Sequence, residues 1–114
     1  MKNPNEFLPL SPATLHILLS LAGEDLHGYG IMQEVSRQSE GRYKLGPGTL
    51  YDNLQRLIDL GLVKEAGQRA ADERRRYYRL SRAGLSVLSA ETTRLEGVVR
   101  EARLRMQQRE PKEV

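Results

Sequence analysis

The segment KLGPGTLYDNLQRLIDLGLV, residues 44–63, holds the side chains best suited by type and spacing to bind a partner. Its apolar residues recur at helical intervals, so they share one face of a helix that stops at Gly61. The remaining surface carries hydrogen-bonding side chains: Thr49, Tyr51, Asp52, Asn53, Gln55 and Arg56. The apolar face would hold this helix on the body of the protein, which leaves the polar face for a partner.

The start of this helix is suited to a phosphate group. Gly46 and Gly48 let the backbone come close to a phosphate, and the free N–H groups at a helix start carry a partial positive charge. Lys44 precedes the turn and is a further expected phosphate contact. Three more side chains can reach phosphates or base edges: Thr49, Asn53 and Arg56. Arginine pairs with guanine and asparagine with adenine, and by helical angle we expect Arg56 to point outward.

The charge of the chain is unevenly distributed. The net charge is +3 over 114 residues, but residues 42–82 carry ten Lys or Arg against five Asp or Glu. Residues 1–41 carry two against five, and residues 83–114 carry six against five. A local basic excess favours a polyanionic partner such as DNA. The alternative is a solvated basic face with no partner.

Composition argues against an enzyme or a metal protein. The chain has no cysteine, which excludes disulfides and Cys-based zinc sites and fits a cytoplasmic location. His16 falls in an apolar helical stretch and His27 in a turn, and neither has a nucleophile or acid nearby in sequence. We therefore expect no catalytic residues, no metal and no cofactor. The longest apolar cluster, LHILLSLAG, is far too short to span a membrane.

Residue patterns predict a mainly α (α+β) fold. Ser11-Pro12 opens the first helix, which we expect to be apolar around most of its girth, and residues 23–28 read as a turn. The expected elements are a helix from residue 12, a helix over 28–39, a third helix that follows Gly46-Pro47-Gly48 and stops at Gly61, strands over 62–67 and 75–81, and a helix over 81–108. Three helices and a hairpin make a winged helix-turn-helix, in which the third helix enters the DNA major groove.

The hairpin tip, or wing, would contribute arginines to the same surface. The candidates are Arg69, Arg74, Arg75 and Arg76. Because Asp72 and Glu73 dilute the positive charge, we expect phosphate contacts and one minor-groove arginine at most. Tyr78 and Leu80 share one strand face and are expected in the core.

The final helix carries a heptad pattern typical of a dimer interface. Its stripe consists of Leu85, Leu88, Thr92, Leu95, Val99, Ala102 and Met106. The stripe is longer than a small body can cover, which favours pairing with a second copy. The alternatives are a helix folded back on the first helix, or a membrane-surface helix; the mixed charges of its polar side disfavour the latter.

Three stretches, LHGYGIMQEV, LGPGTLYDNLQRLIDLGLV and RRYYRLSRAG, together resemble the PadR family of transcriptional regulators over about residues 8–90. The single final helix resembles the compact subgroup. The resemblance implies a dimeric winged-helix regulator, usually a repressor, on an inverted-repeat operator, often released by a small molecule. Tyr51 matches the tyrosine of the family's recognition helix, which implies a phosphate contact, although its ring can also pack on the body. Tyr29 matches the Gly-Tyr pair and implies a backbone contact or a packing role.

We therefore expect a DNA-binding domain over residues 1–80 and a dimerisation helix with its tail over residues 81–114. The expected partners are double-stranded DNA, a second copy of the chain and a possible small-molecule effector, with no membrane. Thr92 is a polar residue at an a position, so the contact between the two final helices should be weak around Thr92, Leu95 and Val99. This weakness motivates a ligand site between the final helices. The alternative function is a winged-helix module that binds protein rather than DNA, because one fold serves both uses.

Overall fold

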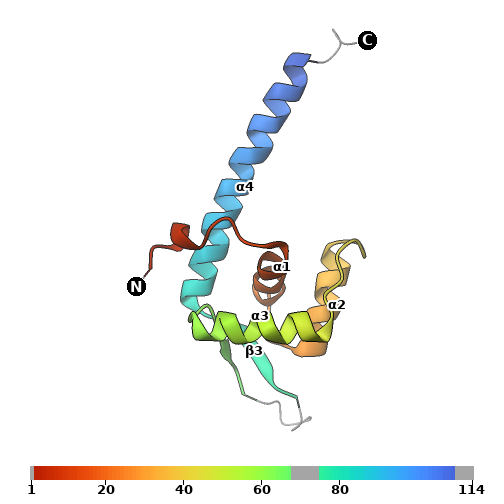
Figure 1. Cartoon of the computed structure of the whole chain (residues 1–114), viewed down its shortest axis with the longest axis vertical. Helices are drawn as coiled ribbons and strands as arrows, with labels where there is room; N and C mark the ends of the chain where they lie inside the picture. Colours follow the sequence, from red (N-terminus) through yellow and green to blue (C-terminus); the bar gives the residue numbers. More distant parts are fainter. Residues whose placement is uncertain (1, 68–74, 110–114) are drawn as a thin grey trace.

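The computed structural model describes residues 2–67 and 75–109 (Figure 1). The elements are the 3-10 helix η1 (Pro4–Phe7), α1 (Pro12–Leu21), β1 (Leu26–His27), α2 (Gly28–Gln38), α3 (Pro47–Asp59), β2 (Val63–Glu65), β3 (Tyr77–Leu80) and α4 (Arg82–Arg109). The fold is therefore mostly helical with a small sheet, and the expected class is confirmed. Figure 1 shows α4 projecting from the body on the side opposite the hairpin.

Helix α1 lies at the centre of the core. Ser11 caps it by accepting the N–H of Thr14 on its side-chain oxygen, and Pro12 occupies the first turn. Ile17 and Leu18 are completely buried. Leu19 is 44% exposed, so the helix is not covered all around as expected. One side of α1 remains open next to α4.

The sheet has three strands in the order β1-β3-β2, all antiparallel. The expectation of a simple turn over residues 23–28 was wrong, because Leu26 and His27 form β1 and pair with Tyr78 and Tyr77 of β3. The guanidinium of Arg79 donates to the Asp25 carboxylate at 2.8 Å beside this pairing. The wing is thus attached to the segment that leads into α2.

Helix α3 ends before Gly61 as predicted and has the predicted apolar face. Leu50, Leu54 and Leu57 are buried, with 1% or less of their surface exposed. The helix ends where Gly61 adopts a φ of +79°, which is the left-handed conformation that glycine tolerates. The N–H of Leu62 bonds the Leu57 carbonyl and that of Gly61 bonds the Ile58 carbonyl, as in a Schellman cap.

The first turns of α4 belong to the core, and the rest extends beyond it. Ser81 accepts the N–H of Gly84 on its side-chain oxygen at the helix start. A Cβ atom on Gly84 would overlap the Leu62 carbonyl oxygen, so the glycine allows α4 to pack against the end of α3. Val87 and Glu91 are buried, whereas every residue from Val98 to Arg109 is exposed. Within the described residues, no helix combines the length and apolar character needed to cross a membrane.

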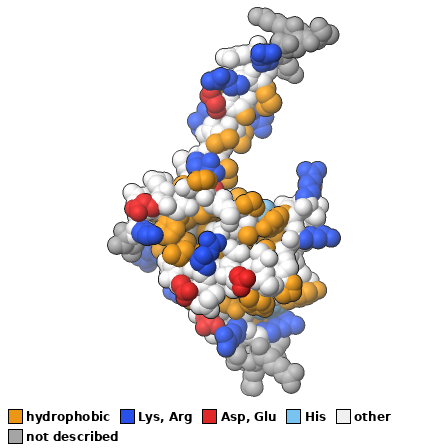
Figure 2. All heavy atoms as spheres, viewed as in Figure 1, with side chains coloured by type: hydrophobic (Ala, Val, Ile, Leu, Met, Phe, Trp, Pro, Cys, Tyr) orange, Lys and Arg blue, Asp and Glu red, His pale blue; other side chains and the backbone are white. Residues whose placement is uncertain are grey.

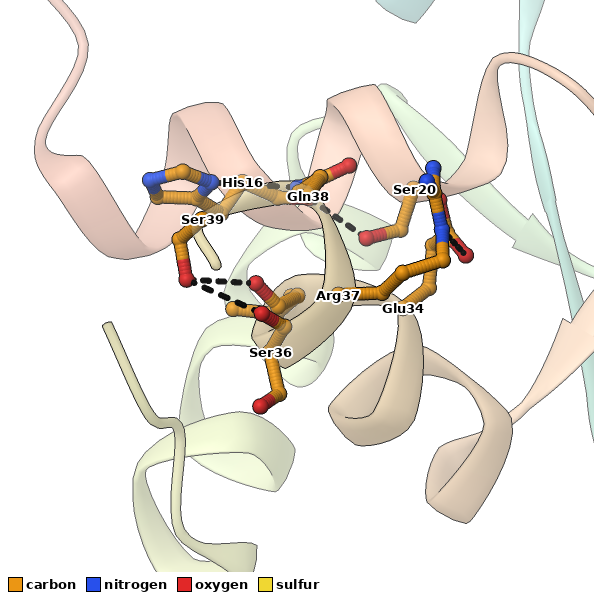
Figure 3. A network of polar contacts seen from close by, with 8 residues as sticks. His16, Ser20, Glu34, Ser36, Arg37, Gln38 and Ser39 are labelled. Atoms are coloured by element: carbon orange, nitrogen blue, oxygen red, sulfur yellow. Dashed lines mark hydrogen bonds and ion pairs between the residues drawn. The ribbon is translucent and has the colours of Figure 1, made fainter. Parts of the chain in front are cut away.

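A polar network joins the C-terminal end of α2 to α1 (Figure 3) and, through Ser39, to the loop that leads into α3. The Nε2 atom of Gln38 lies 3.0 Å from Nδ1 of His16 and donates to the His16 carbonyl at 3.1 Å. The Ser39 hydroxyl donates to the Val35 carbonyl at 2.9 Å and accepts the N–H of Tyr43 at 3.0 Å. The Tyr43 ring stacks on His16 with centroids 4.9 Å apart. His16 is therefore a satisfied helix histidine, as predicted.

Candidate nucleic-acid interface

The start of α3 is open on its outer side. The N-cap residue is Gly46, which has no side chain to bond the first N–H groups of the helix. Among the described residues, a Cβ atom on Gly48 would meet no heavy atom within 4 Å. Lys44 and Thr49 are exposed, while Leu45 is buried and anchors the loop between them. Packing against the part of the chain that the structure describes does not require glycine at position 48, which leaves space beside it for a partner.

Two polar residues of α3 are held by contacts within the chain. The Asn53 side chain donates to the Thr49 carbonyl at 2.8 Å and accepts from Arg56 Nη2 at 2.8 Å. The same Arg56 nitrogen donates to the Thr14 hydroxyl on α1 at 3.1 Å. Arg56 is exposed, but its guanidinium lies back toward α1 and does not point straight outward as expected. A base contact by Arg56 would require these two hydrogen bonds to open or to be shared.

Tyr51 connects α3 to the first turn of α2. Its side chain is 49% exposed, yet a Cβ atom on Gly28 would overlap the Tyr51 hydroxyl. Tyr29 follows on the same turn and is 60% exposed. Both tyrosines line a depression of about 370 Å³, together with His27, Gly28, Arg75, Arg76 and Tyr78. The Tyr51 ring therefore packs at one edge and presents the other edge to solvent, and its phosphate contact stays a prediction.

The described arginines of the wing face this depression. Arg75 Nη1 lies 2.9 Å from His27 Nε2, and Arg76 Nη1 lies 3.4 Å from the Glu65 carboxylate. Burial raises the pKa of the Tyr78 phenol, and nearby Tyr51 and Glu65 raise it further. Arg69 and Arg74 lie outside the described residues. The structure thus brings four of the expected residues together: Tyr29, Tyr51, Arg75 and Arg76.

His27 is a site residue that the sequence did not indicate. Its Nδ1 atom accepts the N–H of Gly30 at 3.0 Å and so caps α2. Its ring also meets the Tyr77 ring edge-on, with centroids 5.3 Å apart. Nδ1 faces the Gly30 N–H and Nε2 faces the Arg75 guanidinium, which can only donate, so both contacts call for a ring acceptor although the neutral ring has just one. A histidine immediately before the helix-opening Gly28 was the only available signal.

The heptad stripe of α4 divides into three environments. Leu88 is buried in the core of the single chain, which differs from the expectation that it faces a partner. Leu85 lines a second depression, separate from the one beside Tyr51, together with Asn3 and Pro4 of the N-terminal segment. The other stripe residues are exposed or half-buried: Thr92, Leu95, Val99, Ala102 and Met106. The Thr92 hydroxyl donates to the Leu88 carbonyl at 2.9 Å, so this polar atom is satisfied within the helix.

An apolar groove runs between α1 and α4. Its volume is about 570 Å³, and Leu15 and Leu19 of α1 line it opposite Leu95 and Val99 of α4. From the sequence, the apolar residues of α1 were expected in the core, and contact between α1 and α4 was considered only as the alternative in which the final helix folds back on the first. Hydrophobic side chains on the exposed part of α4 are visible in Figure 2. Among residues 2–67 and 75–109, no three His, Asp or Glu side chains are grouped to hold a metal ion.

Comparison with known proteins places these features in context. The model of the "Transcriptional regulator PadR-like family" matches residues 17–90. The chain is 42% identical over 88 residues to the transcriptional regulator Rv3488 of Mycobacterium tuberculosis, which covers 76% of this chain and 78% of that protein.

Solved structures share the fold at lower identity. A PadR family transcription regulator from Clostridium difficile superposes with a TM-score of 0.71 at 20% identity, covering 84% of this chain and 99% of that one. The Bacillus subtilis PadR in complex with operator DNA gives a TM-score of 0.63 at 20% identity, covering 72% of this chain and 46% of that one.

Proposed function

The chain belongs to the PadR-like family of transcriptional regulators, and we propose that it acts as a homodimeric repressor on an inverted-repeat operator. This family consists of regulators and not of enzymes. A neighbour in fold, the Bacillus subtilis PadR, was solved with operator DNA. We infer that double-stranded DNA is the partner of this chain as well.

The observation that carries the proposal is the open, glycine-lined start of α3. The side chains that hold α3 to the body are buried on its inner face, whereas Gly48 and Thr49 at its outer start are exposed. Backbone N–H groups at a helix start bind phosphate through their partial positive charge. The recognition helix would therefore enter the major groove with its first turn against the DNA backbone.

The depression between Tyr51 and the wing supports a second phosphate contact. Arg75 Nη1, which can only donate, lies 2.9 Å from His27 Nε2 and lines this depression. An anionic oxygen placed in the depression would accept from the Arg75 guanidinium. Tyr29 and Tyr51 line the same depression, so their hydroxyls would contribute to the same phosphate contact.

The groove between α1 and α4 supports a dimer. Leu19, Val99 and Met106 are exposed large apolar side chains, and a helix that projects from its body needs a partner for such a surface. A second copy related by a two-fold axis would cover it. The two recognition helices would then meet half-sites roughly one helical turn apart, which is about 34 Å.

We also propose that a small molecule controls operator binding. A ligand held between the final helices near Thr92 and Val99 would change the angle between the two DNA-binding halves. By linkage, an effector that weakens operator binding must bind the DNA-free dimer more tightly than the DNA-bound dimer.

The proposal is tested by selecting duplexes from a random pool with the purified protein. The expected product is an inverted repeat whose half-sites are centred about 10 base pairs apart, or a multiple of this spacing. A pool that yields no enriched sequence would point instead to a winged helix whose partner is a protein.

A further inference from the structure

A pocket of about 350 Å³ lies between the N-terminal arm, which we define as residues 2–10, the C-terminal end of α3 and the first turns of α4. Its apolar lining consists of Pro4, Phe7, Leu60, Leu62, Ala83 and Val87. A cavity of about 150 Å³ is enough to hold a benzene ring. The pocket therefore has room for a monocyclic ring with a substituent, and it is separate from the groove between α1 and α4.

The aromatic ring in this pocket already attracts a cation. The Lys2 ammonium lies 5.4 Å from the centre of the Phe7 ring, within the range of a cation–π contact. Lys2 is exposed and has a long flexible side chain, so it can move aside at little cost. A ligand cation would take its place over the ring and would keep its apolar part inside the pocket.

The carboxylate in the lining of the pocket has the complementary charge. Asp59 lines the pocket at the last helical residue of α3, and its side chain accepts a hydrogen bond from Gln55 at 3.0 Å. The carbonyl end of a helix carries a partial negative charge, which adds to that of the carboxylate. In Figure 2, hydrophobic side chains gather near the N-terminal end of the chain with acidic and basic side chains around them.

We propose that the pocket beneath the N-terminal arm binds a small hydrophobic cation, such as an aromatic amine or a quaternary ammonium compound. The apolar walls would take the organic group, while Phe7 and Asp59 would select a positive charge. An anion would have the displaceable Lys2 and the positive N-terminal end of α4 in its favour, but it would meet the Asp59 carboxylate and the negative end of α3.

Occupation of this pocket would act on the junction between α3 and α4. Leu60 is the C-cap residue of α3, and Leu62 touches α4 through its carbonyl at Gly84. A ligand that pushes on these residues would shift the recognition helix relative to the helix that carries the dimer surface. This consequence rests on the proposed function, whereas binding to the pocket does not.

The test uses benzyltrimethylammonium as the probe, with benzyl alcohol and benzoate as neutral and anionic counterparts. Each is titrated into the full chain and followed by NMR. The expected result is saturable shifts at Phe7, Ala83 and Val87, with the cation bound most tightly. Shifts confined to Leu15 and Leu95, equal affinity for cation and anion, or no saturable shift at all would overturn the proposal.

A pair of charge variants sharpens this test. Asp59→Asn keeps a side-chain oxygen that can accept from Gln55. It should lower the affinity for the cationic probe by about twofold to fivefold, the range expected of a surface charge pair. Glu101→Gln removes the same charge far along α4 and should leave the affinity unchanged. Equal affinities in the two variants would contradict the role of Asp59, and thermal unfolding of both would show that the fold is intact.

Operator affinity tests separately whether a ligand in this pocket affects DNA binding. Operator affinity measured with and without the probe should differ if the pocket acts on α3. If the probe binds but operator affinity does not change, the binding site is supported and its effect on DNA binding is contradicted. Failure to bind any DNA would count against the proposed function, and the NMR result would be unaffected.

Discussion

The buried carboxylate of Glu91 on α4 accepts a hydrogen bond of 3.0 Å from the backbone N–H of Leu10, 81 residues earlier in the chain. The same carboxylate accepts from Arg94 at 2.6 and 3.0 Å, and only 1% of the residue is exposed. This contact fastens the N-terminal arm to the helix that extends from the body. Acid should weaken this attachment, because protonation of the carboxylate removes the charge that strengthens its hydrogen bonds to Leu10 and Arg94.

Glu91→Gln should lower the free energy of unfolding by about 1–2 kcal/mol, because the amide oxygen can still accept but the charge assistance of the hydrogen bonds to this buried group is lost. The hydrogen bond with Arg94 lowers the pKa of Glu91 against the opposing effect of burial, and the Leu10 N–H lowers it further. Since the folded-state pKa is below the unfolded value, the stabilisation is present above that value and is lost as pH falls through the folded pKa. Denaturant titrations from pH 7 to pH 3 should therefore show a steeper loss of stability for wild type than for the variant. Parallel curves would contradict this account.

Gly48→Ala separates folding from DNA binding. The new methyl group meets no described atom within 4 Å, and alanine favours a helix, so stability should rise by about 0.5 kcal/mol. Operator affinity should fall, because the methyl group would occupy the space where a phosphate approaches. Gly97→Ala is the matched control, since it makes the same change in open space on α4. If both variants bind operator like wild type, the phosphate does not approach at Gly48.

Arg75→Ala should weaken binding to all duplexes alike. Arg75 faces the depression with His27 and is expected to contact a phosphate, which carries no sequence information. The slope of log affinity against log salt should fall by about one unit. Arg105→Ala serves as the control, because Arg105 pairs with Glu101 on the exposed part of α4. A loss confined to one base position would mean that Arg75 reads bases.

Val99→Glu should convert the proposed dimer to a monomer without unfolding it. Val99 is exposed in the single chain and lines the groove with Leu19, so only a paired copy would bury the new charge. Leu104→Glu is the matched control, because Leu104 is equally exposed and lies about 140° around the helix from Val99. Size-exclusion chromatography with light scattering distinguishes the states. A Val99→Glu protein of unchanged mass would place the interface elsewhere.

The local features of the fold could be predicted from the sequence because their causes lie within a few residues. The buried leucines of α3, its end at Gly61 and the Ser11 cap of α1 each depend on a short pattern. Strand β1 has only two residues, and its partner Tyr78 lies about 50 positions away, so no local period marked it.

The site was harder to predict because its contacts join distant segments. Arg56 faces outward on a helical wheel, but its hydrogen bond to Thr14 crosses to α1 and turns the guanidinium back. Spacing alone also placed Leu88 on the partner surface, whereas the fold buries it in the core. Leu19 read as core and is exposed beside α4. In each case the packing of one helix on another decides where the side chain points and whether it is buried. The residue pattern of a single helix carries no information about that packing.

The most direct test of the central claim is the affinity of the purified protein for the duplex recovered by selection, compared with a scrambled duplex of the same length. Fluorescence anisotropy over a salt series would measure both. The account predicts binding that weakens steeply with salt and favours the selected duplex by about a thousandfold or more near physiological salt. Equal affinity for the two duplexes at every salt concentration would contradict a sequence-specific regulator.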